Sequence, residues 1–402
     1  MKCNEKSLFA ARDQELLLRA ALLKGTDAVD AWNAWESAVD WEGHLENRTF
    51  DLLPLLYINL QRLGVEHPHM NILKGIYRQA WYKNQRFFSE AGRTLAALHK
   101  TGVHTMVLKG IPLTVLHYKN YGVRPMSTID ILVPSSEALL TADALNKVGW
   151  SPMMTAGEDY IQYQHPLRFL SESGMELALH RYLIFKSSRS DSDSDFWNKA
   201  VPIVIHHIPA YAQNPADMLF HVIVDGAKWN PEPSIHWIAD AITIMQSSHT
   251  EVDWSRIINQ AKKHKVSLQM KEALHYLDEN FQAGVPKTIM DRTKSIPVSS
   301  LEQFEYRRVI SCHETDRETL LGGFPLYLIE YLRLTRDTGL WPALAGFPKF
   351  LKYRLDEKNY LHLVFSLLSR IMKTIRRKLS GFMRRKSMKP EDAASGRGNV
   401  FR

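Results

Sequence analysis

The chain has 402 residues, of which 45% are hydrophobic and 23% are charged. This composition is that of an ordinary globular protein with room for two or three domains, and it excludes a fibrous or wholly disordered chain. Its two cysteines, Cys3 and Cys312, argue against a disulfide framework and against a cysteine-rich zinc site. Such sparse cysteine is consistent with a reducing compartment.

The net charge of +8 is concentrated near the C-terminus. Residues 370–389 contain nine lysines and arginines and no acid, and removing these nine charges from +8 leaves −1 for the rest of the chain. A body that binds nucleic acid would carry a basic face of its own. We therefore expect no sequence-specific nucleic-acid partner. The basic and apolar residues of the tail suggest an anionic membrane surface as a partner, with a solvated basic tail as the plainer alternative.

The chain begins with charged residues and lacks the apolar core of a signal peptide. No apolar run in the sequence reaches the length of a membrane span. We expect a soluble, cytoplasmic protein, peripheral at the inner membrane if its tail binds there.

Residues 1–100 are expected to be helical, because apolar residues recur at intervals of three and four. Pro54 is expected at a helix start or break rather than inside a helix. Trp32, Trp35 and Trp41 could form a stacking platform, but core packing of an amphipathic helix is the better interpretation.

From residue 102 the pattern changes to short β-rich runs. Strands are expected at 103–108 and 128–133 with a short helix between them, then a helix that begins at Ser135 and ends at Gly149, and a further strand after it. The residues on either side of Ser173-Gly174 predict a hairpin. This order describes a small mixed sheet.

From Asn214 onward the pattern is helical again. The predicted fold class is therefore α+β, a small mixed sheet embedded in a mostly helical chain. We expect an N-terminal helical region (1–100), an α/β core (101–210), a helical domain (211–300), C-terminal helices (301–380) and a disordered basic tail (381–402).

The stretch 103–134 carries the residues that suggest phosphate and metal chemistry. Lys109 and Gly110 end the first strand, Arg124 lies in the following loop, and Asp130 lies inside the apolar second strand. Lysine, arginine and a glycine amide are groups that bind phosphates. Nucleotidyl transfer uses two carboxylates on one strand face to hold divalent cations, and D-x-D is their minimal spacing. Thr128-Ile129-Asp130 supplies half of that pair.

Each of these residues has a plainer interpretation when it is taken alone. A lone aspartate on a strand is most often a turn or edge residue, and a Lys-Gly pair is weak evidence for phosphate binding. His180, near the end of the hairpin, is more often a hydrogen-bonded sheet residue than a metal ligand. The order of the parts along the chain is what favours the functional interpretation.

The segments VLKGIPLTVLHY and VRPMSTIDILV resemble the signature of the uncharacterised nucleotidyltransferase family, which is related to the minimal nucleotidyltransferases of the polymerase-β type. Members typically show LKG, a short helix and then R-x-x-x-D-I-D-x-L-V. The order and spacing of the helices and of the hairpin are also similar, so the resemblance covers roughly residues 10–375.

The resemblance implies a nucleotidyltransferase-like core that transfers a nucleoside monophosphate from an NTP to an unknown acceptor, with Mg²⁺ or Mn²⁺. Asp130 and Glu176, the latter from the hairpin strand, would be catalytic and would hold the metal. The nucleotide and its phosphates would be bound by Lys109, Gly110, Arg124 and Thr128.

The sequence departs from the family pattern at three positions. Thr128 replaces the first aspartate of D-x-D, Ala178 replaces an acid near the strand histidine, and Asp225 replaces a histidine in a later helix. A hydroxyl cannot replace the charge of a carboxylate at a site for two cations. Two interpretations therefore stay open: an active nucleotidyltransferase, or a catalytically degenerate relative that binds a nucleotide or a partner. The second includes a peripheral membrane scaffold in envelope or polysaccharide assembly.

Overall fold

The computed structural model describes residues 10–41, 47–153, 165–184, 192–227, 235–247 and 252–311, and parts of the range 324–376. Its contacts divide the chain into two compact units, residues 1–310 and 311–402. The finer division into five parts that the sequence suggests stays a prediction. Among the described residues, no helix is long and apolar enough to cross a membrane.

The N-terminal region is helical, as expected. Its helices are α1 (Arg12–Leu22), α2 (Gly25–Glu36), α3 (Asn47–Arg62) and α4 (Met70–Lys100). Trp32 and Trp35 are almost fully buried, which confirms that they belong to the core. Pro54 lies inside α3, so the prediction of a helix boundary there is wrong. Its missing N–H leaves the carbonyl of Phe50 without its usual helical donor.

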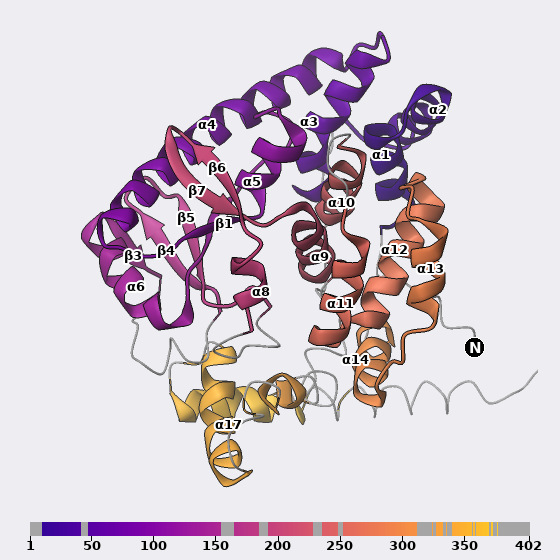
Figure 1. Cartoon of the computed structure of the whole chain (residues 1–402). Helices are drawn as coiled ribbons and strands as arrows, with labels where there is room; N and C mark the ends of the chain where they lie inside the picture. The colour runs from indigo at the N-terminus through magenta and orange to yellow at the C-terminus, as the bar shows by residue number, and fades with distance from the viewer. Residues whose placement is uncertain are drawn as a thin grey trace, which may run out of the picture. The chain divides into compact units, whose positions relative to one another are not determined.

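The first unit contains a seven-stranded mixed sheet (Figure 1), which confirms the α+β class. The strands are β1 (Met106–Leu108), β2 (Thr128–Leu132), β3 (Trp150–Pro152), β4 (Leu167–Ser171), β5 (Glu176–His180), β6 (Val201–Ile205) and β7 (Ile208–Ala212), in the order β3-β4-β5-β2-β1-β7-β6. The middle strand, β2, pairs antiparallel with β1 and parallel with β5. The long helix α4 packs along this sheet and contacts β2, β6 and β7.

The connections follow the sequence pattern except at one hairpin. Helix α5 (Gly110–Leu113) and the π-turn η1 (Thr114–Tyr118) join β1 to β2, and η2 (Ser135–Glu137) and α6 (Ala138–Lys147) join β2 to β3. The expected hairpin forms as β4 and β5. The β6–β7 hairpin is the exception. Its turn is formed by His206 and His207 in the left-handed conformation, whereas such turns are usually recognised in a sequence by Asn-Gly.

Helices follow the sheet, as expected. They are α9 (Pro215–Gly226), α10 (His236–Gln246), α11 (Trp254–His264), α12 (Ser267–Phe281), α13 (Lys287–Lys294) and α14 (Ser300–Ser311). The short helix α8 (Ser194–Trp197) lies earlier, between β5 and β6. The side chains of Asn214 and Asp253 cap α9 and α11 by accepting main-chain N–H bonds. The second unit contains α17 (Leu340–Arg354) and a helical stretch at residues 360–369.

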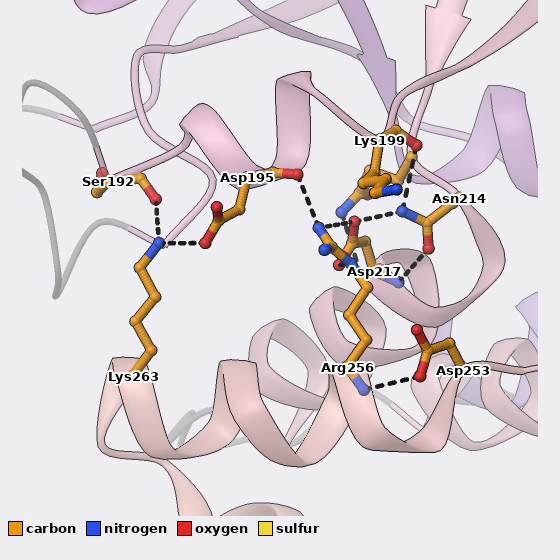
Figure 2. A network of polar contacts seen from close by, with 9 residues as sticks. Ser192, Asp195, Lys199, Asn214, Asp217, Asp253, Arg256 and Lys263 are labelled. Atoms are coloured by element: carbon orange, nitrogen blue, oxygen red, sulfur yellow. Dashed lines mark hydrogen bonds and ion pairs between the residues drawn. The ribbon is translucent and has the colours of Figure 1, made fainter.

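A polar network anchors the start of α9 (Figure 2). Arg256 on α11 donates two hydrogen bonds of 2.7 Å to the carboxylate of Asp217, which is buried in the first turn of α9. The same guanidinium donates to the main-chain oxygen of Asp195 at 2.7 Å, and Lys263 binds the Asp195 carboxylate at 2.7 Å. A bidentate pair of this kind fixes direction as well as distance. The network therefore sets the direction in which α9 runs.

A second buried ion pair ties the loop before β2 to α10. Arg124 donates from Nε and Nη2 to the two oxygens of Asp240, each at 2.8 Å, and Tyr118 donates to Asp240 Oδ1 at 2.8 Å. A Cβ on Gly110 would lie 2.8 Å from Nη1 of Arg124, so a larger residue there would force the guanidinium or Met126 to move. The pair joins three separate segments of the first unit.

We predict that Asp240→Asn lowers the free energy of unfolding of this unit by about 3–5 kcal/mol, because it leaves the buried Arg124 charge uncompensated. Urea denaturation followed by circular dichroism measures the change. The control is Arg168→Gln, which removes the exposed Arg168–Glu176 pair and is expected to cost less than about 1 kcal/mol. Equal losses in the two variants would contradict the prediction.

Candidate functional site

The site is built around Asp130, which lies on the middle strand of the sheet. In register, Asp130 lies opposite Leu108 on β1 and Ala178 on β5. Both flanking strands are largely buried, and the side chain of Asp130 is 3% exposed. A carboxylate in such a position must find partners within the protein, because water does not reach it.

Three side chains supply those partners. Lys109, directly after β1, places Nζ 3.1 Å from Asp130 Oδ1, and His180 at the end of β5 places Nε2 2.8 Å from the same oxygen. Thr128 donates its hydroxyl to Oδ2 at 2.7 Å. His180 is therefore the hydrogen-bonded sheet residue that the plainer interpretation expected. Both oxygens of Asp130 are engaged.

Lys109 also reaches a second carboxylate, which comes from the helical part of the unit. Its Nζ lies 3.3 Å from Oδ2 of Asp225, near the end of α9. The ammonium thus lies between two carboxylates, in the position that a cation bound by both would take. Sequence reasoning noted Asp225 only as a departure from the family pattern. The only sequence signal for Asp225 is an acid at the next-to-last position of a helix. Only the fold brings this carboxylate beside Lys109.

The backbone of Lys109 is strained. Its φ of 58° and ψ of −122° lie outside the regions that a residue with a side chain normally occupies. Conformations of this kind cost about 1–3 kcal/mol and persist where the surrounding structure enforces them, often at functional sites. Here the strain places the Lys109 side chain at the sharp turn from β1 into α5.

Burial, neighbouring charges and hydrogen bonds together set the pKa values in this cluster. Burial by itself would raise the pKa of Asp130, but Lys109 and the hydrogen bonds from His180 and Thr128 outweigh it and hold that pKa well below its usual range. Burial lowers the pKa of His180, so the ring is neutral and donates from Nε2. Burial would also lower the pKa of Lys109, but Asp225 and Asp130 raise it above its usual range. The cluster therefore holds a charged Asp130 carboxylate beside the Lys109 ammonium.

The remaining predicted site residues lie nearby in other arrangements. Glu176 is opposite Thr128 in register, two residues along the strands from Asp130, and it forms an ion pair of 3.0 Å with Arg168. Arg124 is engaged by Asp240, and Gly110 packs against Arg124. The roles of Glu176, Gly110 and Arg124 in catalysis, metal binding or nucleotide binding stay predictions. Most of the basic segment 370–389 lies outside the described residues.

The donor set fits one divalent cation better than two. Mg²⁺ takes oxygen ligands and is typically held by one or two carboxylates together with substrate phosphates. Asp130 and Asp225 supply two carboxylates around one point. A pair of cations needs bridging carboxylates on one strand face, and Thr128 offers only a hydroxyl there.

Comparisons with known proteins place this arrangement in a family. No curated protein matches the chain. A solved structure, an antigenic nucleotidyltransferase-like protein from Paracoccidioides brasiliensis, matches with 11% sequence identity and a TM-score of 0.34, covering 53% of this chain and 94% of that one. The family model described as "Uncharacterised nucleotidyltransferase" matches residues 38–282, more than half of the chain. The chain belongs to this uncharacterised nucleotidyltransferase family.

Proposed function

We propose that the chain binds a nucleoside triphosphate with one divalent cation at Asp130, Asp225 and Lys109, and transfers the nucleoside monophosphate to an acceptor. The observation that supports this most is the position of Lys109 Nζ, 3.1 Å from Asp130 and 3.3 Å from Asp225. The ammonium holds the place of a cation between two carboxylates and is itself a phosphate-binding group.

In this mechanism Lys109 exchanges partners. Its side chain is about one-third exposed, so the ammonium can turn from the carboxylates toward an incoming phosphate while the strained backbone keeps the residue in place. Asp130 is held in its charged form by the hydrogen bonds from His180 and Thr128. The divalent cation would align the phosphate oxygens and neutralise charge that develops during transfer.

The second candidate is a relative that binds nucleotide without turnover. The observation that favours it is the hydrogen bond of 2.7 Å from Thr128 Oγ1 to Asp130 Oδ2. The hydroxyl occupies one oxygen of the remaining aspartate and stands where the family places a second carboxylate. Such a site would hold nucleotide and one cation but would lack the second cation that activates the acceptor.

We predict that each NTP, titrated calorimetrically with Mg²⁺, binds the native protein, and that Asp130→Asn weakens the magnesium-dependent binding by about tenfold or more. Lys109→Met should weaken NTP binding by about 10- to 100-fold even without metal, because it removes a charged hydrogen-bond donor to phosphate. Unchanged binding in both variants would overturn the proposal.

Two further variants show whether the effects are specific to the proposed site. Asp291→Asn removes an exposed acid far along the chain, on α13, and should leave binding unchanged. Glu176→Gln tests the predicted metal role of Glu176: weaker magnesium affinity supports that role, whereas unchanged affinity restricts Glu176 to its pair with Arg168.

We predict that Thr128→Asp strengthens magnesium binding in the presence of an NTP, because it restores a second carboxylate on the same face of β2. Without metal the variant should melt at a lower temperature than the native protein, since two neighbouring carboxylates then repel each other. Thr128→Asn has similar size and no charge, so it should show no gain in affinity. The absence of a gain in Thr128→Asp would contradict the degenerate interpretation.

An additional role at an anionic membrane is supported by the helical stretch 360–369 and the residues that follow. One face exposes a row of large apolar side chains, each at least half exposed: Leu361, Val364, Phe365, Leu368 and Met372. Their spacing of three and four places them on one stripe of a helix. The nine basic residues of 370–389 begin at the end of this stripe, a combination suited to an anionic lipid surface.

We predict that the full chain sediments with vesicles containing phosphatidylserine and far less with phosphatidylcholine vesicles. Replacing Leu361 and Phe365 together with asparagine should reduce the sedimented fraction, because it removes buried apolar area from the lipid contact. The control is Val204→Asn, which changes an exposed apolar residue of β6. Equal sedimentation with both lipids, or no effect of the double variant, would rule out this role.

A further inference from the structure

A second cluster of metal-binding side chains lies in the N-terminal helical region, away from the residues assigned above. Glu36 is the last residue of α2, and His67 and His69 lie in the connection that leads into α4. It is the one group of three or more histidine, cysteine or carboxylate ligands among the described residues whose ligand atoms all lie within 4.8 Å of one another. All three side chains are about one-quarter exposed.

The distances in this cluster are those of a metal site rather than of hydrogen bonds. Oε1 of Glu36 lies 3.6 Å from Nε2 of His67 and 3.5 Å from Nδ1 of His69. Both separations are too long for good hydrogen bonds. Zinc bonds of about 2.0–2.1 Å at tetrahedral angles separate neighbouring ligand atoms by about 3.4 Å. The two separations from Glu36 therefore match an edge of a zinc tetrahedron, and the ligand atoms of all three residues lie within 4.8 Å of one another.

The local backbone holds the two histidines in this arrangement. His67-Pro68-His69-Met70 forms a turn in which the amide of Met70 donates to the carbonyl of His67 at 3.0 Å. Proline at the second position of such a turn has its φ already set, and His69 has the φ of −74° and ψ of −7° expected at the third. The ligands are thus placed before a metal arrives, which reduces the entropy lost on binding.

One ring nitrogen of this cluster is available to bind a metal. Nδ1 of His69 is buried and has no hydrogen-bond partner in the part of the chain that the structure describes. Trp41 stacks on the His69 ring with centroids 4.1 Å apart, and Trp32 meets the His67 ring edge-on at 5.4 Å. These indoles limit the movement of both imidazoles and shield one side of the cluster from water.

One contact would have to change. Nδ1 of His67 accepts a long hydrogen bond of 3.3 Å from the amide of His69, so the ring proton lies on Nε2, toward Glu36. When a metal binds Nε2, that proton moves to Nδ1 and the long bond opens. A hydrogen bond of this length is weak. Its loss costs little free energy compared with the gain from binding a metal through two imidazoles and one carboxylate.

We propose that Glu36, His67 and His69 bind one zinc-like transition-metal ion, which ties the end of α2 to the turn before α4. Two imidazoles and a carboxylate suit zinc and leave the fourth position to water. A bound metal would also fix where α4 begins, because α4 starts directly after His69. The site is independent of the nucleotide site at Asp130.

The experiment is a calorimetric titration of the full chain, free of any affinity tag, with zinc chloride after chelator treatment. We expect saturation at one zinc per chain and a higher melting temperature with zinc. Glu36→Gln, His67→Gln and His69→Gln should each weaken zinc binding by about tenfold or more and should abolish the thermal shift. Asp130→Asn should retain zinc binding, which separates this site from the proposed nucleotide site.

The matched control is His275→Gln. His275 also lies close to a glutamate, at 3.2 Å from Glu279, but has no second histidine in the cluster, so zinc binding should be unchanged. If the ligand variants fail to fold, cobalt binding to the native chain decides: intense visible bands of four-coordinate cobalt at one equivalent support the site. The weak spectrum of six-coordinate cobalt, no zinc saturation, or equal binding by folded ligand variants would overturn it.

Discussion

The ammonium of Lys109 joins the two halves of the first unit. It binds Asp130 in the middle of the sheet and Asp225 near the end of α9, so a strand and a helix that are about a hundred residues apart in sequence meet at one charge. Asp130 is buried so completely that it depends on this partner and on the hydrogen bonds from His180 and Thr128. A buried carboxylate without such compensation would be neutral or would destabilise the fold. The same compensation keeps a charged carboxylate ready for a cation.

Two largely buried ion pairs and the partly exposed pair of Lys109 with Asp225 fix the helices that surround this point. At its start α9 is held by the bidentate pair of Arg256 with Asp217, and near its end by Asp225 and Lys109. Helix α10 is held by Asp240 and Arg124. Pairs of this type contribute little net stability compared with apolar packing, but breaking one is costly, so they specify orientation. The geometry around Lys109 is therefore set by elements that cannot shift independently.

The proposed nucleotide site and the proposed zinc site differ in chemistry and in how they are built. Around Asp130 the donors are oxygens and the charges are balanced by a lysine, which favours a hard cation that arrives with phosphates. Around Glu36 the donors are mainly imidazoles on a proline-stiffened turn, which favours a transition metal that stays in place. Helix α4 relates the two, because one site lies where it begins and the sheet along which it packs carries the other.

The sequence by itself determined the α+β class, the two strands around Asp130, the β4–β5 hairpin and the family, because apolar periodicity, glycine turns and the spacing of LKG to IDILV are local signals. It did not indicate the β6–β7 hairpin, whose turn is made of histidines, or the continuation of α3 through Pro54. Only the tertiary structure decided that Lys109 binds Asp225, that Arg124 is engaged by Asp240, and that Glu36 meets His67 and His69. Each of these contacts joins residues from separate elements, and the physical reason is general: a side chain's partner is selected by packing and by the need to compensate buried charge, which no local pattern records.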